Sequence, residues 1–498
     1  MEDALNSTRL RRTAAALGLI AALLCVPIVD AQAESLQSAL SSAYSYNPQL
    51  DAERARLRAT DEGVSQAEGQ FRPTITGNGS IAYENSQTRS TGGANSLTPN
   101  TSGQQVQRND TFHPKNVGVT ITQPIFRGFR SINGVNVAEA NVRAGRETLR
   151  NTEQTILIGA ITSFMDTVRD QAILKLRENN QRVLADTLRS TKDQFTVGEV
   201  TRTDVAQAEA SLAGAVSAIE LAKANLKSSR ATYERFIGHA PANLVEPKPL
   251  SKIIPKTVDE AVGIAIQETP TVVSALYTEQ SARFNVDLIR GELLPTLNLQ
   301  GTYNDNIDPS PQSQESRVAT VTGQLTVPIY EQGIVYSRVR QAKHTHLAAI
   351  QEIQRTKTEA QATAVAAWSQ QQASRAQLAS DQASVDSNKI ALAGVREEEK
   401  VGQRTKLDVL NAEQTYLNAQ VNLVTTRRNV IVNDYTLLQS IGRLNMLELA
   451  AVPQVYDPEE HYFEVRRKWW GLDITHSDGR HERLDVWRSH GEQHESMK

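Results

Sequence analysis

The sequence predicts a mixed α and β fold that is duplicated in tandem and dominated by very long helices. Three observations predict it. Short motifs recur in the same order in both halves of the chain, each half contains two segments of period-two alternation, and each half ends in long helical segments without proline. Only 5% of the residues are aromatic and 39% are hydrophobic, which suits extended amphipathic helices better than a dense globular core.

The N-terminus, residues 1–33, has the pattern of a secretory signal peptide. Three arginines between residues 9 and 12 precede an apolar stretch from Ala14 to Val29, and Ala31-Gln32-Ala33 supplies a small-x-small cleavage pattern. A transmembrane anchor is the alternative, but the apolar stretch is short for one. We therefore expect the mature chain to begin at Glu34.

The charge and the cysteine content exclude several classes of function. The 498 residues include 53 Lys and Arg against 56 Asp and Glu, and a formal net charge of −3 gives no electrostatic reason to expect a nucleic acid partner. The single cysteine, Cys25, lies within the predicted signal peptide. A mature chain without thiols would have no disulfide, no cysteine nucleophile and no thiolate metal site.

The repeated motifs divide the rest of the chain into two copies. We place the first copy at residues 34–238, a proline-rich linker at 239–256, the second copy at 257–447 and a C-terminal segment with a charged tail at 448–498. The paired landmarks are Asn47-Pro48 with Thr269-Pro270, Arg72-Pro73 with Leu294-Pro295, Gln123-Pro124 with Val327-Pro328, Val197-Gly198 with Val401-Gly402, and Ile237-Gly238 with Ile441-Gly442.

Each copy begins with a helical segment, predicted at 35–70 in the first copy and at 258–292 in the second, and a proline follows each of them. Two amphipathic strands come next. We place them near 74–84 and 116–126, and near 297–305 and 317–327.

In these strands apolar residues alternate with small polar ones, as in a transmembrane strand with lipid on one side and water on the other. A soluble, half-buried hairpin has the same pattern. The signal peptide, and the lack of another core for the strands to cover, favour the membrane. The polar stretches between the strands, 85–113 and 306–316, are predicted to be loops.

Very long helices complete each copy, at 132–197 and 201–236 and again at 334–401 and 405–438. The longer helix of each pair would span about 100 Å at 1.5 Å per residue. Helices so long and so weakly apolar need neighbours along their whole length, as in coiled coils. A glycine ends the second long helix of each copy, at Gly238 and at Gly442.

Four strands cannot close a barrel, and an open sheet edge in lipid leaves backbone groups unpaired. Closure therefore requires several chains. Three chains would form a trimeric, 12-stranded transmembrane β-barrel, continued by a long α-helical barrel.

The duplicated layout resembles the TolC-type outer-membrane factor family. The resemblance covers Ser35 to Leu447, and its most specific element is the Val-Gly turn followed by Thr-x-x-Asp in both copies. It implies a homotrimer with a β-barrel in the outer membrane of a Gram-negative bacterium and a helical tunnel in the periplasm. The implied partners are outer-membrane lipid, a periplasmic adaptor (membrane fusion) protein and an inner-membrane pump. The implied function is drug efflux or type I protein secretion, without enzymatic activity and without a cofactor.

The resemblance also assigns roles to the turns between the long helices. The implied contacts with the adaptor are Val197, Gly198, Val401 and Gly402. A plain turn between two helices, without any contact to a partner, would account for the same residues.

A gate is implied next to these turns. Thr201 with Asp204, and Thr405 with Asp408, match the spacing of a capping box. The resemblance makes Asp408 an acid of the ring at the closed entrance. It also makes Arg404 a link to Thr203 and Asp204.

The sequence departs from the family pattern at two positions of the gate. Asn411 stands at the position of a second ring acid and Glu399 at that of a linking tyrosine, so the gate would be less anionic or held by other contacts.

Three other patterns are judged not to form sites. Residues 77–82 match a dinucleotide fingerprint as a string but lie in a predicted strand and open no helix. His344 and His346 are two residues apart on a helix and face different directions. The histidines after Gly471 belong to a tail predicted to be solvated, with metal binding as the alternative. They are His476, His481, His490 and His494.

Two other classes of protein stay open as alternatives. A structural coiled-coil or adhesin-type surface protein would share the signal peptide and the helices, but it would not need four amphipathic strands placed symmetrically. An enzyme would be expected to contain a nucleophile elbow, zinc-ligand spacing or a phosphate loop, and the sequence contains no convincing example of any of them. Trp469 and Trp470, in the C-terminal segment, are expected to pack that segment onto the helices.

Overall fold

The computed structural model describes residues 34–91, 105–250, 253–310, 313–449, 455–475 and 481–482. The predicted signal peptide, residues 1–33, lies outside the described residues, as do His476, His490 and His494. Among the described residues, no helix combines the length and the apolar character needed to cross a bilayer.

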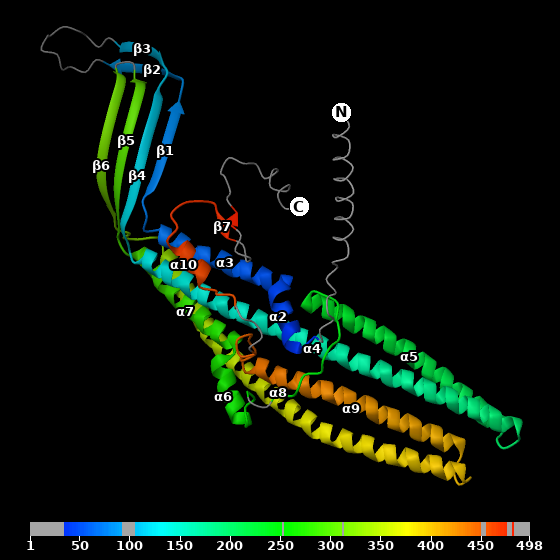
Figure 1. Ribbon diagram of the computed structural model, residues 1–498. Helices are drawn as coiled ribbons and strands as arrows, with labels where there is room; N and C mark the ends of the chain where they lie inside the picture. Colours follow the sequence, from blue (N-terminus) through cyan, green and yellow to red (C-terminus); the bar gives the residue numbers. More distant parts are fainter. Residues whose placement is uncertain are drawn as a thin grey trace, which may run out of the picture.

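The molecule has a sheet at one end and two long helical hairpins that extend away from it (Figure 1). The first copy consists of α2 (Leu36–Tyr46), α3 (Pro48–Gly69), β1 (Thr74–Ile81), β2 (Glu84–Thr91), β3 (Gln105–Phe112), β4 (Lys115–Arg127), α4 (Arg130–Thr196) and α5 (Arg202–Ile237). The second consists of α6 (Val258–Glu268), α7 (Pro270–Arg290), the short η1 (Gly291–Leu293), β5 (Thr296–Ser310), β6 (Ser313–Thr326), α8 (Ile334–Lys400) and α9 (Lys406–Ser440). The C-terminal segment contributes α10 (Glu460–Arg466), β7 (Ile474–Thr475) and β8 (His481–Glu482).

The first helical segment of each copy is two helices rather than the one predicted. The breaks fall before Pro48 and Pro270, where Asn47 and Thr269 adopt extended backbone with ψ of 116° and 126°. A proline ring disfavours helical backbone in the residue before it, and this accounts for both breaks. Asn47 then caps α3, because its side chain accepts a hydrogen bond from the amide of Gln49 at 3.0 Å.

The four predicted strands form one antiparallel sheet in the order β1-β4-β5-β6. The central pair, β4 and β5, joins the two copies, so each copy supplies one edge strand. The helices also join the two copies, because α4 of the first copy packs against α7 and α9 of the second.

The predicted loop at 85–113 is wrong for most of its length, because β2 and β3 form a two-stranded antiparallel ribbon from Glu84↔Phe112 to Thr91↔Gln105. The predicted loop at 306–316 is likewise shortened, since β5 runs to Ser310 and β6 begins at Ser313. Main-chain hydrogen bonds need no apolar side chains, so polar strands pair without the alternation that a sequence search uses.

The main hydrophobic core lies around the middle of α4, where both copies meet. Its largest buried side chains come from α2, α3, α4, α5 and α9 and from the residue that follows α9. They include Leu40, Phe164, Tyr233, Leu437 and Ile441. Toward the free ends of the hairpins the buried clusters become small, such as Leu184 with Ala215 and Leu410. The hairpins are thus well anchored at one end and thinly packed at the other.

Gly442 ties the end of the second copy to the first. Its backbone is left-handed, with φ of 78°, and its carbonyl accepts hydrogen bonds from Arg150 Nη2 at 2.8 Å and Gln154 Nε2 at 2.9 Å. A Cβ at this position would lie 2.5 Å from the carbonyl oxygen of Glu268. Only glycine fits this position without distortion.

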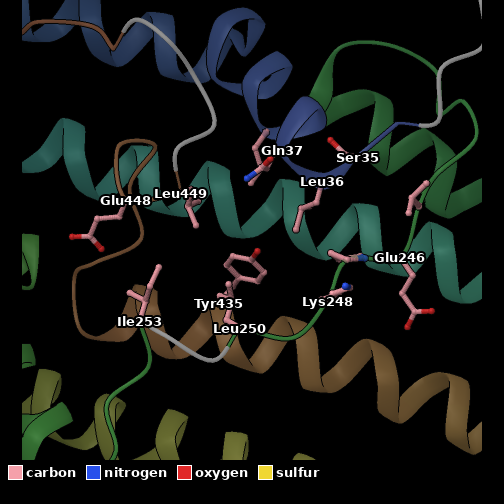
Figure 2. Close-up of a pocket in the computed structure, with 13 residues that line it drawn as sticks. Ser35, Leu36, Gln37, Glu246, Lys248, Leu250, Ile253, Tyr435, Glu448 and Leu449 are labelled. Carbon is pink, nitrogen blue, oxygen red and sulfur yellow. The ribbon is translucent and has the colours of Figure 1, made fainter.

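A pocket of about 340 Å³ lies where the linker between the copies crosses the core. Figure 2 shows Leu36 from α2, Leu250 from the linker and Tyr435 from α9 around it. Burial raises the pKa of Tyr435 to about 12, with the nearby charge of Asp434 adding to the effect, so its phenol stays neutral. The pocket belongs to the junction of the two copies, and we assign no ligand to it.

We predict that Gly442→Ala destabilises the protein. A non-glycine residue in left-handed backbone costs about 1–3 kcal/mol, and the collision with Glu268 adds to that cost. The thermal midpoint of the purified protein in detergent, followed by the helical circular dichroism signal, should fall. Gly394→Ala is the matched control, because Gly394 lies on an exposed part of α8 where an added Cβ would meet no atom within 4 Å. An equal or higher midpoint for Gly442→Ala than for Gly394→Ala would contradict this prediction.

Candidate functional site

The four-stranded sheet has two chemically different faces. Directly opposite residues share a face, and the register places apolar and small residues together in successive rows. One such row is Ile75, Ile121, Gly301 and Val321, and the next is Gly77, Val119, Tyr303 and Ala319. The alternate rows contain Thr76, Thr120, Thr302 and Thr320, then Asn78, Gly118, Asn304 and Val318, then Ser80, Asn116, Asn306 and Ser316. We call the face with the first two rows the apolar face, and the face with the three alternate rows the polar face.

Side-chain amides connect the strands across the polar face. Asn78 Nδ2 donates to Asn116 Oδ1 at 3.0 Å, and Asn116 in turn donates to Asn306. Gly118 makes room in this layer, because a side chain there would collide with Asn304. The result is a neutral, hydrogen-bonding surface that favours water without a fixed charge.

The apolar face and both sheet edges are uncovered in the single chain. Ile75 is 67% exposed and Val321 is 77% exposed, values far above those of a soluble core strand. β1 pairs only with β4, and β6 pairs only with β5, so each outer strand has one edge of unpaired backbone among the described residues. Such edges require a partner strand.

The turns between the long helices lie at the far ends of the hairpins (Figure 1). The two turns have matching backbone, with φ of 80° at Gly198 and 78° at Gly402. Val197 and Val401, directly before these glycines, are 71% and 70% exposed. The tips therefore present equivalent apolar side chains to the solvent.

Both predicted capping boxes are present next to these turns. Asp204 Oδ2 accepts the amide and the hydroxyl of Thr201 at 2.8 and 2.7 Å, and Asp408 Oδ2 accepts those of Thr405 at 3.0 and 2.8 Å. Hydrogen bonds from the threonine hydroxyl and amide lower the pKa of Asp204, and those from the amide and hydroxyl lower the pKa of Asp408. Both carboxylates therefore stay ionised at neutral pH.

Arg404 lies beside its own helix end in the single chain, where its Nε donates to Glu398 Oε2 at 2.9 Å. A bond from Arg404 to Thr203 or Asp204 is not among the contacts of this one described copy, so that link stays a prediction. Asn411 is exposed, one turn beyond Asp408 on α9.

An ion pair between Lys406 and Glu399 at the second tip was not predicted from the sequence. Lys406 Nζ lies 2.8 Å from Glu399, and both side chains are mostly buried, at 17% and 19% exposure. The positive charge of Lys406 also adds to the lowering of the pKa of Asp204, after the hydrogen bonds from Thr201. The Lys406–Glu399 ion pair thus holds the two sides of the second turn together. Its signal in the sequence is the pair of opposite charges flanking the Val401-Gly402 turn.

The family model described as outer membrane efflux protein matches residues 39–239 and 261–443. The two matched ranges correspond to the two copies of the repeat.

Several relatives match over most of the chain. The outer membrane efflux protein BepC of Brucella suis is 35% identical over 465 residues, which cover 92% of this chain and 97% of that protein. The outer membrane protein TolC of Escherichia coli is 24% identical over 84% of this chain and 85% of its own. The alkaline protease secretion protein AprF of Pseudomonas aeruginosa is 23% identical over 61% of this chain and 65% of its own.

The fold is similar to that of solved channels. The Campylobacter jejuni CmeC outer membrane channel superposes with a TM-score of 0.71 at 18% identity, covering 88% of this chain and 90% of that one.

We predict that Thr405→Ala loosens the first turn of α9. Loss of an N-cap hydroxyl costs about 1 kcal/mol, and the amide of Asp408 loses its side-chain acceptor and keeps only the Thr405 carbonyl. Hydrogen–deuterium exchange of peptides that span residues 402–412 should become faster. The control is Thr415→Ala, since the exposed Thr415 hydroxyl bonds only to the Asn411 carbonyl within the helix. If exchange in this region changes equally in the two variants, the cap has no special role.

Proposed function

The chain belongs to the outer membrane efflux protein family, and on that premise we propose that three copies form one continuous duct from the periplasm to the cell exterior. Members of this family are outer-membrane channels that serve efflux or secretion. The protein accordingly is an outer-membrane channel for export.

The observation that carries the proposal is a sheet with one apolar face, one polar face and two unpaired edges. Edge pairing between copies, β1 of one against β6 of the next, would close the 12-stranded barrel and satisfy the backbone groups of both edges. The apolar face, with Ile75 and Val321, would contact lipid. The polar face, with its layers of Asn and Thr, would line a hydrated lumen.

The helical hairpins would continue the lumen into the periplasm. Their thin packing toward the tips supports this, because the small clusters there leave helix faces that another copy can cover. At the tips, Val197, Gly198, Val401 and Gly402 would contact a periplasmic adaptor, which connects the duct to an inner-membrane pump.

The chain would catalyse no reaction of its own, because the pump provides the energy for transport and the duct provides the passage through the outer membrane. The runner-up, a structural coiled-coil or adhesin-type surface protein, leaves the two-faced sheet without a purpose. The family match also favours the channel.

We further propose that the tips close the periplasmic entrance. Three Asp408 carboxylates would form an anionic ring, which attracts cations and repels anionic solutes. Asn411 makes the next layer neutral. Arg404 would link to Thr203 and Asp204 across the tips, in exchange for its present bond to Glu398.

The function is tested by measuring how much of a fluorescent efflux dye accumulates in cells with and without the gene. Deletion should raise retention of the dye, and a plasmid copy should restore the original level. Unchanged retention, together with an exported protein lost from the culture supernatant, would assign the duct to protein secretion. Unchanged retention with an unchanged set of exported proteins would contradict an export role in these cells.

For the gate, Arg404→Ala should raise the conductance of the closed channel in planar bilayers by roughly threefold or more. An exposed ion pair contributes about 0.2–1 kcal/mol, and a three-fold ring loses three of them. Lys400→Ala is the matched control, because Lys400 is exposed at the same tip and pairs only with Glu397 of its own helix. Equal conductance of the two variants would place the lock elsewhere, with the Lys406–Glu399 pair as the next candidate.

A further inference from the structure

Residues Arg466–Trp470, which begin at the last residue of α10, form a basic and aromatic segment at the foot of the sheet. Arg72, two residues before β1, donates from Nη1 to the carbonyl of Lys468 at 2.8 Å, and its guanidinium lies 4.8 Å from the ring of Trp469. Figure 1 shows α10 beside the end of α3 from which β1 rises. The segment therefore lies at the level where the sheet meets the helices.

This position is held by contacts of α10 with the body of the protein. Val465 is 2% exposed, and His461 Nδ1 lies 3.1 Å from Asp61, which is fully buried on α3. Arg466 forms ion pairs with Glu68 and Glu139. The segment is thus fixed from below and presents its other side chains outward.

Its aromatic side chains are uncovered in the single chain. Trp469 is 64% exposed, Trp470 is 86% exposed and Phe463, on α10, is 61% exposed. The expectation that both tryptophans pack onto the helices is therefore wrong, since Trp469 only stacks on Arg72. Tryptophan is enriched where a membrane protein passes from lipid to water, because its ring has an apolar body and a polar N–H.

The segment also carries positive charges that form no ion pair in the described part of the chain. Among the described residues, Arg72, Arg467 and Lys468 have no carboxylate within ion-pair distance, and Lys468 Nζ bonds to the carbonyl of Asp473. Glu68 and Glu139 are paired with Arg466.

An open hollow of about 640 Å³ lies between this segment, the end of α3 and the start of α4. Its lining includes the apolar residues Phe71, Ile132 and Val135 and the guanidinium groups of Arg72 and Arg467. Two carboxylates, Glu68 and Glu139, also line it, and both form ion pairs with Arg466, so their charges are offset. Apolar side chains beside guanidinium groups that have no carboxylate partner match a molecule with a phosphate and a hydrocarbon chain.

We propose that the Arg466–Trp470 segment and this hollow bind an anionic phospholipid of the periplasmic leaflet of the outer membrane. The phosphate contacts Arg72, Arg467 and Lys468, the upper acyl carbons contact Phe71 and Ile132, and the two tryptophan rings lie in the headgroup layer. The inference rests on the proposed function, because it takes the sheet above the segment as the membrane-spanning part. The bound lipid sets the depth at which the sheet sits in the membrane.

The first test uses the tryptophans themselves as probes. Trp368→Phe with Trp487→Phe leaves Trp469 and Trp470 as the only tryptophans of the full chain. Reconstituted in vesicles of phosphatidylglycerol and phosphatidylcholine, this variant should lose much of its emission when the lipids are brominated near the headgroup. It should lose less when they are brominated at the chain end. No quenching by either lipid, in a protein that still forms trimers and conducts, would overturn the lipid contact and leave the channel intact.

The second test measures the lipid preference. Native mass spectrometry of the detergent-solubilised trimer should detect phosphatidylglycerol bound in preference to phosphatidylcholine. Arg467→Ala with Lys468→Ala should weaken that binding by at least tenfold, since each basic side chain near an anionic surface contributes roughly fivefold. Lys175→Ala with Arg189→Ala is the matched control, because it removes two exposed charges from the half of α4 remote from the sheet.

Excess inorganic phosphate should not displace the bound lipid. Displacement would show that the site binds a free anion rather than a membrane lipid, and would overturn the proposal. Equal binding of both lipids by all variants would overturn the charge-based recognition. Loss of trimers or of conductance in the unmutated protein would instead contradict the proposed duct.

Discussion

The unpaired edges of a four-stranded sheet are the constraint on which the rest of the structure depends. Backbone groups at an edge must find partners, and in lipid no water can replace them. β1 and β6 supply one such edge each, from different copies of the repeat. Tandem duplication doubles the strands that one chain brings, and oligomerisation supplies the remainder. The two faces of the sheet follow from the same arrangement, because alternation along each strand then separates a lipid side from a water side.

The helices obey a different rule, because no single copy can bury them along their full length. The chain concentrates its large apolar residues at the junction of the two repeats, around Phe164, Tyr233 and Leu437, and thins the packing toward the tips. Specific polar contacts hold the junction together. Gly442 accepts from Arg150 and Gln154, and buried Asp434 accepts from Gln371 and Arg375. A rigid middle with loosely held ends suits the opening at the tips that we propose.

At the tips, the same two aspartates cap their helices and carry negative charge. Asp204 and Asp408 cap their helices, and the hydrogen bonds that make them good caps also keep them ionised. The sign of the pH dependence follows from this. Because their folded pKa values are lowered, their contribution to stability is present above the ordinary aspartate range and is lost as the pH falls through the folded values. The caps therefore keep their full effect at neutral pH.

The sequence by itself determined the duplication, the four alternating strands, the long helices, the tip turns and both capping boxes, and the family resemblance is confirmed. Apart from the duplication, which a comparison of the two halves reveals, these features are local, since each depends on residues close to one another in the sequence. Only the tertiary structure decided the β2–β3 ribbon, whose polar strands carry no alternation, and the Lys406–Glu399 pair across a turn. The same holds for the place of Arg466–Trp470 beneath the sheet, because Lys468 meets Arg72 through contacts between residues distant in the sequence. No periodicity records such contacts, since they depend on how whole elements pack.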